Sequence, residues 1–373
     1  MPFAAALSSY PVTAHATGEV IGQVIDQLGT HPDLAVLAVS SGHLGALEDA
    51  AAAVRSLLAP TVLLGWVAAQ VTTGAVLPSP PQTARVDALG LWAAHTGPVV
   101  PVRLAGGGAS GWTEAACGSF EPQGLVVAGA AGTAGERSFP DGCFPSGLAI
   151  AGAISEVPGA PVVLDGATYT SGAVGVLVGP GVDLTVIVEQ GRRPIGSPST
   201  VTRAEGSLVV DLDGRPAMAV LVDIARDQVP ACDIALINRS LHLQVTTTPG
   251  AAPTLHAVRG RDASTSALVA DPQLQVGDVV QFCVRDPERA AQRARQVVDG
   301  AEAGALVWQT RRSAARLDED RRVGSKARSG SEPHPAPALL ASGAASLLGG
   351  SSPPGEADTI SIGLFRERQV TPG

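Results

Sequence analysis

Apolar positions near the start of the chain alternate between helix-like and strand-like patterns. In GEVIGQVIDQL (Gly18–Leu28) the apolar residues recur three and four positions apart, which predicts one buried stripe on a helix. DLAVLAV (Asp33–Val39) and TVLLGWVA (Thr61–Ala68) are continuous apolar runs of strand length, typical of strands covered on both faces. Between them, Leu44–Ala59 predicts a second helix, which Pro60 ends. This order predicts a layered unit of helices and strands.

The pattern changes after Leu89, where shorter apolar runs are separated by turn residues. Leu125–Ala131 is strand-like, and Ser146–Ser155 is interpreted as a helix although it contains glycines. Asp165-Gly166 lies between two apolar runs and predicts a hairpin. The predicted fold class is therefore α/β (α+β), with mixed or antiparallel sheets flanked by helices.

We expect two domains, residues 1–215 and 216–373, because a chain of 373 residues exceeds one ordinary hydrophobic core. The second domain follows a turn at Asp213-Gly214. It contains a helix that Asp286 caps, with Pro287 at its first position and Gly300 just past its end. After residue 311 the chain is rich in Arg, Ser, Gly and Pro, which predicts loops or mobile linkers.

Composition limits the classes of partner. Hydrophobic residues make up 45% of the chain and charged residues 16%, so a large core is available and global disorder is disfavoured. A net charge of −9 argues against a nucleic-acid partner, since binding the phosphate backbone requires a surplus of Lys and Arg. The apolar runs are too short for a membrane span, and a basic signal-peptide start is missing. We therefore expect a soluble cytoplasmic protein with no membrane partner.

The cysteines and Gly-rich segments do not predict a cofactor site. The four cysteines form no CxxC pair, which favours free thiols and argues against a zinc site. GGGASG (Gly106–Gly111) matches a dinucleotide-binding pattern, but the residues after it allow barely two helical turns, so a flexible loop is favoured. The single lysine, Lys326, follows Ser325 and excludes a P-loop. We assign no metal, no cofactor and no catalytic residue.

Two adjacent arginines provide the first candidate ligand site. Arg192 and Arg193 lie between Gly191 and a Pro-Ile-Gly turn that ends at Gly196. An arginine can hold a carboxylate or phosphate through two parallel hydrogen bonds, and flanking glycines let backbone N–H groups approach the same anion. The alternative is that the arginines only pair with acidic residues nearby in the sequence. We predict that Gly191, Arg192, Arg193 and Gly196 bind a ligand.

His43 is the second candidate. It follows the predicted strand Asp33–Val39 at the start of the next helix. Open α/β sheets bind ligands at the carboxyl ends of their strands, so His43 is well placed to contact one. The alternative is a solvent-facing histidine in a helix cap.

Several blocks of the sequence resemble the FIST family (F-box and intracellular signal transduction proteins). They are HPDLAVLAVSSGHLGALEDAAAAVRSLLAPTVLLG, LDGATYTSGAVGVLVGP, QGRRPIGSPSTVTRAEGSLVVDLDGRPAMAVL and, near the C-terminus, VGDVVQFCVRDPERA and GALVWQT. The resemblance covers most of Asp33–Thr310. It implies an N-terminal and a C-terminal FIST domain. It also implies a cytoplasmic sensory module that binds small ligands such as amino acids and signals to a protein partner.

The chain departs from the family pattern after its late strand. Relatives there tend to show a Cys-Asn-Gly-Arg-Gly-like loop, whereas this chain reads QTRRS from Gln309 onwards. Gln309 completes the predicted set of ligand-binding residues. The departure predicts a divergent C-terminal part.

These observations favour a non-enzymatic protein that binds a small ligand, such as an amino acid or another small carboxylate, in an intracellular signalling pathway. One alternative is a small-molecule hydrolase or transferase with His43 or Cys143 as its reactive group. A reactive cysteine would need a depressed pKa and a nearby base. The third reading is a structural interaction module without a ligand.

Overall fold

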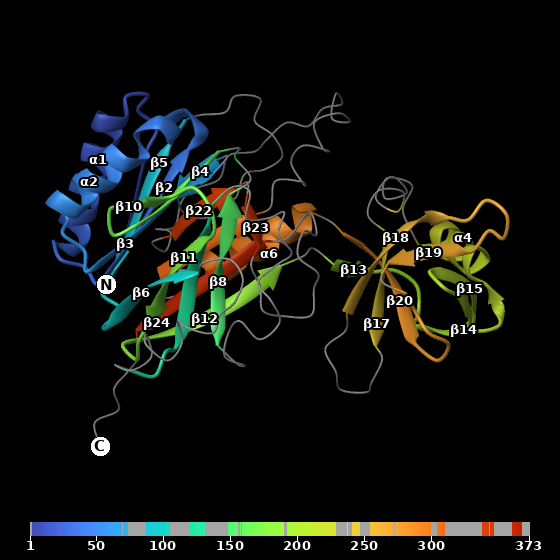
Figure 1. Cartoon of the computed structure of the whole chain (residues 1–373). Coiled ribbons are helices and arrows are strands. Elements are labelled where there is room, and N and C mark those ends of the chain that lie inside the picture. Colours follow the sequence, from blue (N-terminus) through green and yellow to red (C-terminus); the bar gives the residue numbers. More distant parts are fainter. Residues whose placement is uncertain are drawn as a thin grey trace, which may run out of the picture. The chain divides into compact units, whose positions relative to one another are not determined.

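The computed structural model divides the chain into two compact units (Figure 1). Unit 1 combines Met1–Glu189 with Ala291–Gly373, and unit 2 is Gln190–Ala290. The two domains expected from the sequence, 1–215 and 216–373, stay a prediction. The structure describes residues 2–68, 70–73, 87–104, 120–130, 148–155, 157, 159–189, 192–228, 237, 241–246, 254–271, 273–285, 287–299, 304–309, 338–342, 344–346 and 360–367.

A six-stranded sheet organises the N-terminal part of unit 1. Its strand order is β1 (Phe3–Ser8), β5 (Leu89–Ala94), β2 (Leu34–Ser40), β3 (Val62–Ala68), β9 (Val162–Leu164) and β10 (Ala167–Tyr169). β2 and β3 are parallel, and β5 runs antiparallel to both of its neighbours, β1 and β2. Consequently β1, β2 and β3 all end at the same side of the sheet.

Two helices cover one face of this sheet, α1 (Thr13–Leu28) and α2 (Leu47–Leu57), with the short 3-10 helix η1 (Ser41–Ala46) before α2 (Figure 1). Every residue of β2 and β3 is buried, as expected of strands covered on both faces. Along β2, alternate residues pack toward the helices and toward the other side of the sheet. The predicted helices and strands of this region are therefore confirmed, although α1 starts earlier than predicted.

The opposite face packs against two further sheets of unit 1. Trp92 lies in this core, with its ring centroid 6.1 Å from that of Phe3 and 4.9 Å from that of Phe365. One sheet has the order β23 (Ala344–Ser346), β8 (Ala149–Ser155), β7 (Gly124–Gly129), β11 (Ala173–Val178) and β6 (Val99–Leu104). The other has the order β12 (Val182–Glu189), β24 (Ile360–Glu367), β21 (Gly304–Gln309), β22 (Ala338–Ser342) and β4 (Gln70–Thr73).

The predicted helix over Ser146–Ser155 is wrong, because Ala149–Ser155 form strand β8, parallel to β7. Gly152 gives the physical reason. A Cβ at Gly152 would lie 2.0 Å from the carbonyl oxygen of Val127, so the glycine permits a close approach between strands and also weakens a helix. The hairpin predicted at Asp165-Gly166 is confirmed: their φ angles of 50° and 84° suit a two-residue turn with left-handed backbone.

Unit 2 is built around a closed antiparallel barrel. Helix α4 (Ala217–Gln228) packs on its core, and the short strands β13 (Arg192–Pro194) and β16 (Arg215–Pro216) pair outside the ring. The ring is β20 (Val279–Arg285), β14 (Ser199–Glu205), β15 (Leu208–Leu212), β19 (Leu268–Asp271), β18 (Thr254–Arg261) and β17 (Leu241–Thr246), which pairs again with β20.

Helix α6 (Pro287–Asp299) follows β20 where a helix is predicted, although its predicted caps, Asp286 and Gly300, lie outside the described residues. The α/β (α+β) fold class with mixed and antiparallel sheets is confirmed. Among the described residues, no helix combines the length and the apolar character needed to cross a bilayer.

Candidate ligand-binding site

Polar residues gather where β1, β2 and β3 end. β1 ends at Ser8 and β2 at Ser40, and Ser40 is in register with Ala68 at the end of β3. The chain then enters α1 after β1, and η1 after β2. We call Ser8, Thr13, Ser40, His43 and Asp87 the strand-end site.

His43 is the central residue of the strand-end site. Its side chain is only 1% exposed, and its Nδ1 lies 2.8 Å from Oγ1 of Thr13, the first residue of α1. Its Nε2 is buried and has no hydrogen-bond partner among the described residues. The solvent-facing alternative for His43 is therefore wrong. A buried polar atom left without a partner costs about 1–3 kcal/mol, so Nε2 is a group that a ligand could satisfy.

Ser40 fixes an acidic residue beside the turn that carries His43. Its Oγ accepts a hydrogen bond from the backbone N–H of Ala88 at 3.0 Å and donates one to Oδ1 of Asp87 at 3.3 Å. The carboxyl group of Asp87 also lies against Gly42, where an added Cβ would be 2.1 Å from Cγ of Asp87. Asp87 is thus held next to the start of η1 and is exposed to solvent.

The end of β1 shows similar hydrogen bonding. Ser8 is only 2% exposed, and its Oγ donates a hydrogen bond to Glu19 on α1 and accepts one from the backbone N–H of Tyr10 at 3.2 Å. Tyr10 stacks on His15 with ring centroids 5.1 Å apart, and its side chain is exposed. The link between β1 and α1 therefore combines a buried hydroxyl with an exposed aromatic ring.

The start of α1 is not capped by a side chain. Val12 precedes the helix with an extended backbone and makes no side-chain cap, and the first turn contains no acidic residue. The first N–H groups of a helix have no partner within it and carry a partial positive charge. The first turn of α1 can therefore accept an anion from outside the helix.

The structure corrects the prediction of a turn around the two arginines. Arg192–Pro194 form β13, in which Arg192 pairs with Arg285 and Arg193 with Val284 of β20. The backbone N–H of Ile195 continues the pairing at 2.8 Å from the Phe282 carbonyl oxygen. These residues belong to a strand rather than to a turn between strands.

Gly196 has a structural role that explains its presence. Its φ angle of 70° lies in the left-handed region, and a Cβ would lie 2.5 Å from Cδ1 of Ile224 on α4. Its carbonyl oxygen accepts a hydrogen bond from Nε2 of Gln281 at 2.8 Å. Gly196 therefore allows the break between β13 and β14 while α4 packs closely over it.

The six predicted ligand-binding residues divide between the two units. His43 and Gln309, the last residue of β21, belong to unit 1. Arg192, Arg193 and Gly196 belong to unit 2, and Gly191 lies outside the described residues. Cys143, the other reactive group of the enzyme alternative, and the Gly106–Gly111 motif also lie outside the described residues.

The remaining members of the strand-end site escaped sequence reasoning. Ser8 ends a strand that the sequence reading did not recognise, and Asp87 is far from His43 in the sequence. A hydroxyl residue at the end of an apolar run, followed by a helix pattern, is the signal that could have identified Ser8 and Ser40. No pattern in the sequence indicates the contact between Ser40 and Asp87, which depends on β5 pairing with β2.

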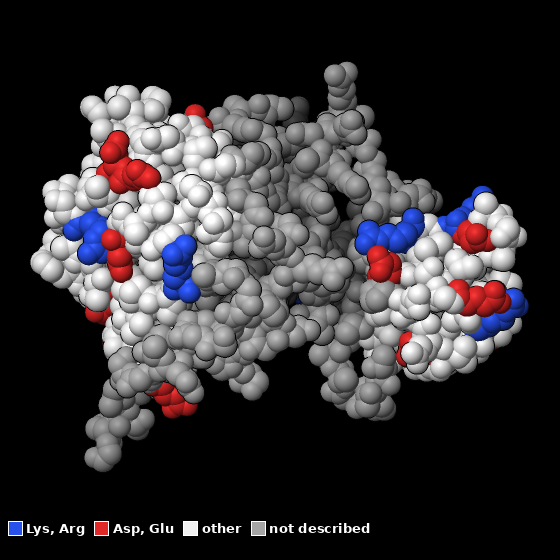
Figure 2. All heavy atoms as spheres, viewed as in Figure 1, with Lys and Arg blue, Asp and Glu red and all other residues white. Residues whose placement is uncertain are grey.

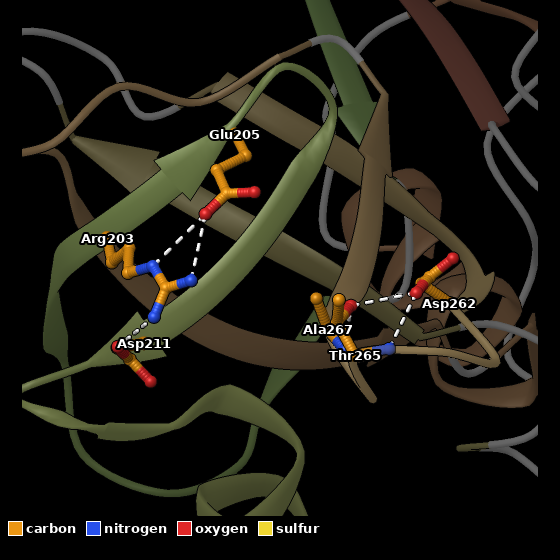
Figure 3. Close-up of polar contacts among 6 residues, drawn as sticks. All are labelled: Arg203, Glu205, Asp211, Asp262, Thr265 and Ala267. Carbon is orange, nitrogen blue, oxygen red and sulfur yellow. Dashed lines mark hydrogen bonds and ion pairs between the residues drawn. The ribbon is translucent and has the colours of Figure 1, made fainter.

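Polar clusters elsewhere in unit 2 stabilise turns and strands (Figure 3). Arg203 donates to Glu205 at 2.9 Å and lies 4.0 Å from Asp211 on the paired strand. Asp262 accepts hydrogen bonds from the hydroxyls of Ser264 and Thr265 and from both of their backbone N–H groups. These bonds, with the Ser264 hydroxyl contributing most, lower the pKa of Asp262 to about 2.

The charges of the described residues form no large basic surface on the face in Figure 2, where acidic and basic side chains lie near one another. The described ranges also contain no group of three or more His, Cys, Asp or Glu residues arranged to hold a metal. The strand-end site is therefore the described region with the clearest polar features for binding a small molecule.

The fold and this site define a class: an α+β protein with polar groups at the carboxyl ends of helix-covered strands, where α/β sheets commonly bind ligands. Residues 33–215 match the FIST N domain, and the chain belongs to the FIST family. That family is generally implicated in sensing during signal transduction.

Two relatives are mycobacterial proteins. The uncharacterized protein Mb0898c of Mycobacterium bovis is 30% identical over 339 residues, covering 80% of this chain and 81% of the relative. The uncharacterized protein Rv0628c of Mycobacterium tuberculosis is 30% identical over 332 residues, covering 80% of each chain. Their similarity extends well beyond the matched FIST N domain.

Proposed function

We propose that this protein is a sensor that binds an amino acid or another small carboxylate and passes its binding state to a signalling partner. The observation that carries the proposal is His43, buried at the carboxyl ends of the strands with Nε2 unpartnered among the described residues. The general sensing role of the FIST family supports the same reading.

The start of α1 favours an anionic group in the ligand. Its first turn has neither a side-chain cap nor an acidic residue, and Thr13 connects it directly to the His43 ring. A carboxylate at this position would receive backbone N–H hydrogen bonds and interact favourably with the helix dipole. With a proton on Nε2, His43 would donate a further hydrogen bond to it.

Asp87 adds a preference for a ligand that also carries a positive charge. Its carboxyl group lies against Gly42, one residue before His43, and Ser40 holds it there. A second carboxylate in the ligand would be repelled by Asp87, whereas an ammonium group would be attracted. Among small carboxylates, an α-amino acid therefore suits the strand-end site better than a dicarboxylate.

Isothermal titration with a panel of amino acids and organic acids tests the proposal. We expect one or more amino acids to bind, and His43→Leu to weaken binding at least tenfold, since a buried hydrogen bond to a charged group is lost. His95→Leu is the matched control, because His95 is exposed just after β5, at the opposite end of the sheet. The proposal fails if nothing in the panel binds, or if His43→Leu binds as tightly as the wild type.

Arg192 and Arg193 remain a separate proposal for unit 2. An Arg192→Ala/Arg193→Ala double mutant tests it in the same titrations. Weaker binding of anionic ligands would support a role for the pair. Unchanged affinity would mean that the two residues serve only as part of strand β13, paired with β20.

A further inference from the structure

Two stacked aromatic rings lie where β1 leads into α1. The rings of Tyr10 and His15 are nearly parallel, with an angle of 10° between their planes and centroids 5.1 Å apart. Tyr10 is 48% exposed, and His15 is exposed as well. In a stacked pair each ring covers one face of the other, and the half-exposed Tyr10 fits a ring whose second face is open to solvent. The pair therefore presents aromatic surface to the solvent.

The stacked pair is attached to the strand-end site at both of its residues. The backbone N–H of Tyr10 donates a hydrogen bond to Oγ of Ser8 at the end of β1. His15 belongs to the first turn of α1, two residues after Thr13, whose Oγ1 is hydrogen-bonded to the His43 ring. The pair is thus a neighbour of the residues from which the site is built.

The open end of α1 lies between His43 and the stacked pair. The N–H of Ala16 donates to the Val12 carbonyl at 3.0 Å, so the N–H groups of the three residues before Ala16 have no partner inside the helix. Side chains two positions apart point to opposite sides of a helix, and all of them tilt toward its N-terminus. Thr13 therefore flanks the open end on the side of His43, and His15 flanks it on the exposed side.

A ligand carboxylate at this open end would be one side-chain length from the stacked rings. His15 supplies both a backbone N–H for the anion and one ring of the pair. The side chain of an α-amino acid leaves the carbon next to the carboxylate, so it can extend over the rings on the exposed side. Residues 9–12 carry no charged side chain, and Val12 is exposed. The surface offered to the ligand's side chain is therefore aromatic and apolar.

We propose that the Tyr10–His15 pair binds the side chain of the ligand, and that the preferred ligand is an amino acid with an aromatic side chain. Stacked aromatic rings gain affinity beyond that of apolar burial alone. A cationic side chain is also attracted to ring faces, but here it would lie at the positive end of the α1 dipole. The inference rests on the proposed function and adds the class of amino acid.

Titration of phenylalanine against cyclohexylalanine tests the preference, because the two have similar size and only the first has an aromatic ring. We expect the wild type to bind phenylalanine about three- to tenfold more tightly. Tyr10→Leu should bring this ratio close to one while binding of cyclohexylalanine changes little, and Tyr10→Phe, which keeps the ring, should preserve the ratio. His15→Leu should also lower it, whereas the matched control His95→Leu, at the opposite end of the sheet, should not.

Proton NMR of the histidine rings tests the placement. The His15 signals are those that disappear from the spectrum of His15→Leu, and His95→Leu identifies the His95 signals in the same way. Saturating phenylalanine should shift the His15 signals, because the ring current of a stacked ligand acts on its neighbours. Cyclohexylalanine should shift them much less, and neither ligand should shift the His95 signals.

The outcomes separate the two proposals. If amino acids bind but phenylalanine has no advantage, or keeps its full advantage in Tyr10→Leu, the aromatic preference is overturned and the proposed function stands. Unmoved His15 signals at saturating phenylalanine overturn the preference as well. His43→Leu should weaken phenylalanine and cyclohexylalanine equally, since it acts on the carboxylate that both share. If no amino acid binds the wild type, the proposed function fails, and this inference falls with it.

Discussion

His43 couples stability to binding at the scale of one residue. Its Nδ1 is hydrogen-bonded to Thr13, whereas its Nε2 is buried without a partner among the described residues. An apolar side chain in place of His43 removes the unsatisfied Nε2 but also loses the hydrogen bond to Thr13, a half-buried residue that water can reach, so the two effects oppose each other. A residue kept for binding rather than for folding should therefore be one whose apolar replacement is tolerated.

We predict that His43→Leu changes the free energy of unfolding of the free protein by less than about 1 kcal/mol, because the relief at Nε2 offsets the lost hydrogen bond to Thr13. The same variant should lose the extra stability that a bound ligand gives the wild type. Tryptophan fluorescence is a suitable probe, because all four tryptophans fall within the ranges of unit 1. A large loss of stability in the free protein would instead indicate a structural role for His43.

Asp262 makes unit 2 sensitive to acid. Its pKa is about 2 in the folded protein and 3.8 for the free group, because Ser264 and Thr265 donate hydrogen bonds to the carboxylate. Folding thus favours the ionised form, so this stabilisation is complete above about pH 4 and is lost as the pH falls through about 2. Asp262→Ala should flatten the decrease in stability of unit 2 over this interval, measured by hydrogen exchange. If the stability of the variant falls with pH as steeply as that of the wild type, Asp262 is not the cause of the decrease.

At the scale of elements, the break between β13 and β14 depends on Gly196. Its left-handed backbone and its contact with Ile224 both disfavour a side chain. Gly206 also has a left-handed backbone, with a φ angle of 59°, but an added Cβ there would have no neighbour within 4 Å. Comparing substitutions at the two glycines therefore distinguishes the cost of backbone strain from the cost of a packing clash.

We predict that Gly206→Ala destabilises unit 2 by about 1–2 kcal/mol, the cost of a left-handed alanine. Gly196→Ala should cost about 1–3 kcal/mol more, because its methyl group must also displace Ile224. Urea unfolding followed by far-UV circular dichroism measures both variants. Equal losses of stability in the two variants would show that α4 moves away from the added methyl group at no cost in free energy.

The sequence predicts elements best where local pattern and tertiary environment agree. β2 and β3 are apolar throughout and are buried on both faces, so their pattern suffices. β8 contains residues that pattern alone assigns to a helix, whereas pairing with β7, which comes very close at Gly152, makes them a strand. The Arg192–Pro194 strand depends on pairing with β20, a distant segment.

The candidate site follows the same rule. The place of His43 just after a strand could be predicted, because the strand is recognisable in the sequence. Its partner Thr13 and the neighbouring Asp87 come from other elements, and no local pattern places them near His43.

At the scale of the whole molecule, unit 2 is inserted within the sequence of unit 1. Unit 1 is interrupted after Glu189 and resumes at Ala291. The strand that begins unit 2 and the one near its end are neighbours, since Arg192 pairs with Arg285. The two ends of this segment are therefore about 5 Å apart, close enough for a short linker to join.

We predict that replacing residues 192–285 by a short Gly-Ser linker leaves unit 1 folded. The Trp92 core should keep its near-UV circular dichroism and its buried fluorescence, because its contacts to Phe3 and Phe365 are within unit 1. The matched control replaces the same residues by a linker of a hundred Gly and Ser residues. Loss of the Trp92 signal in both variants would show that unit 1 requires unit 2 to fold.

Two strands of unit 1 gain their partners only late in protein synthesis. Unit 2 is one continuous segment, so the ribosome delivers all of it before the last strands of unit 1. β4 and β12 must wait for β22 and β24, which are translated much later. Until then their backbone edges are open to pairing with other chains. Slow translation after β21 would prolong this exposure, so the nascent chain is most in need of a chaperone at that stage.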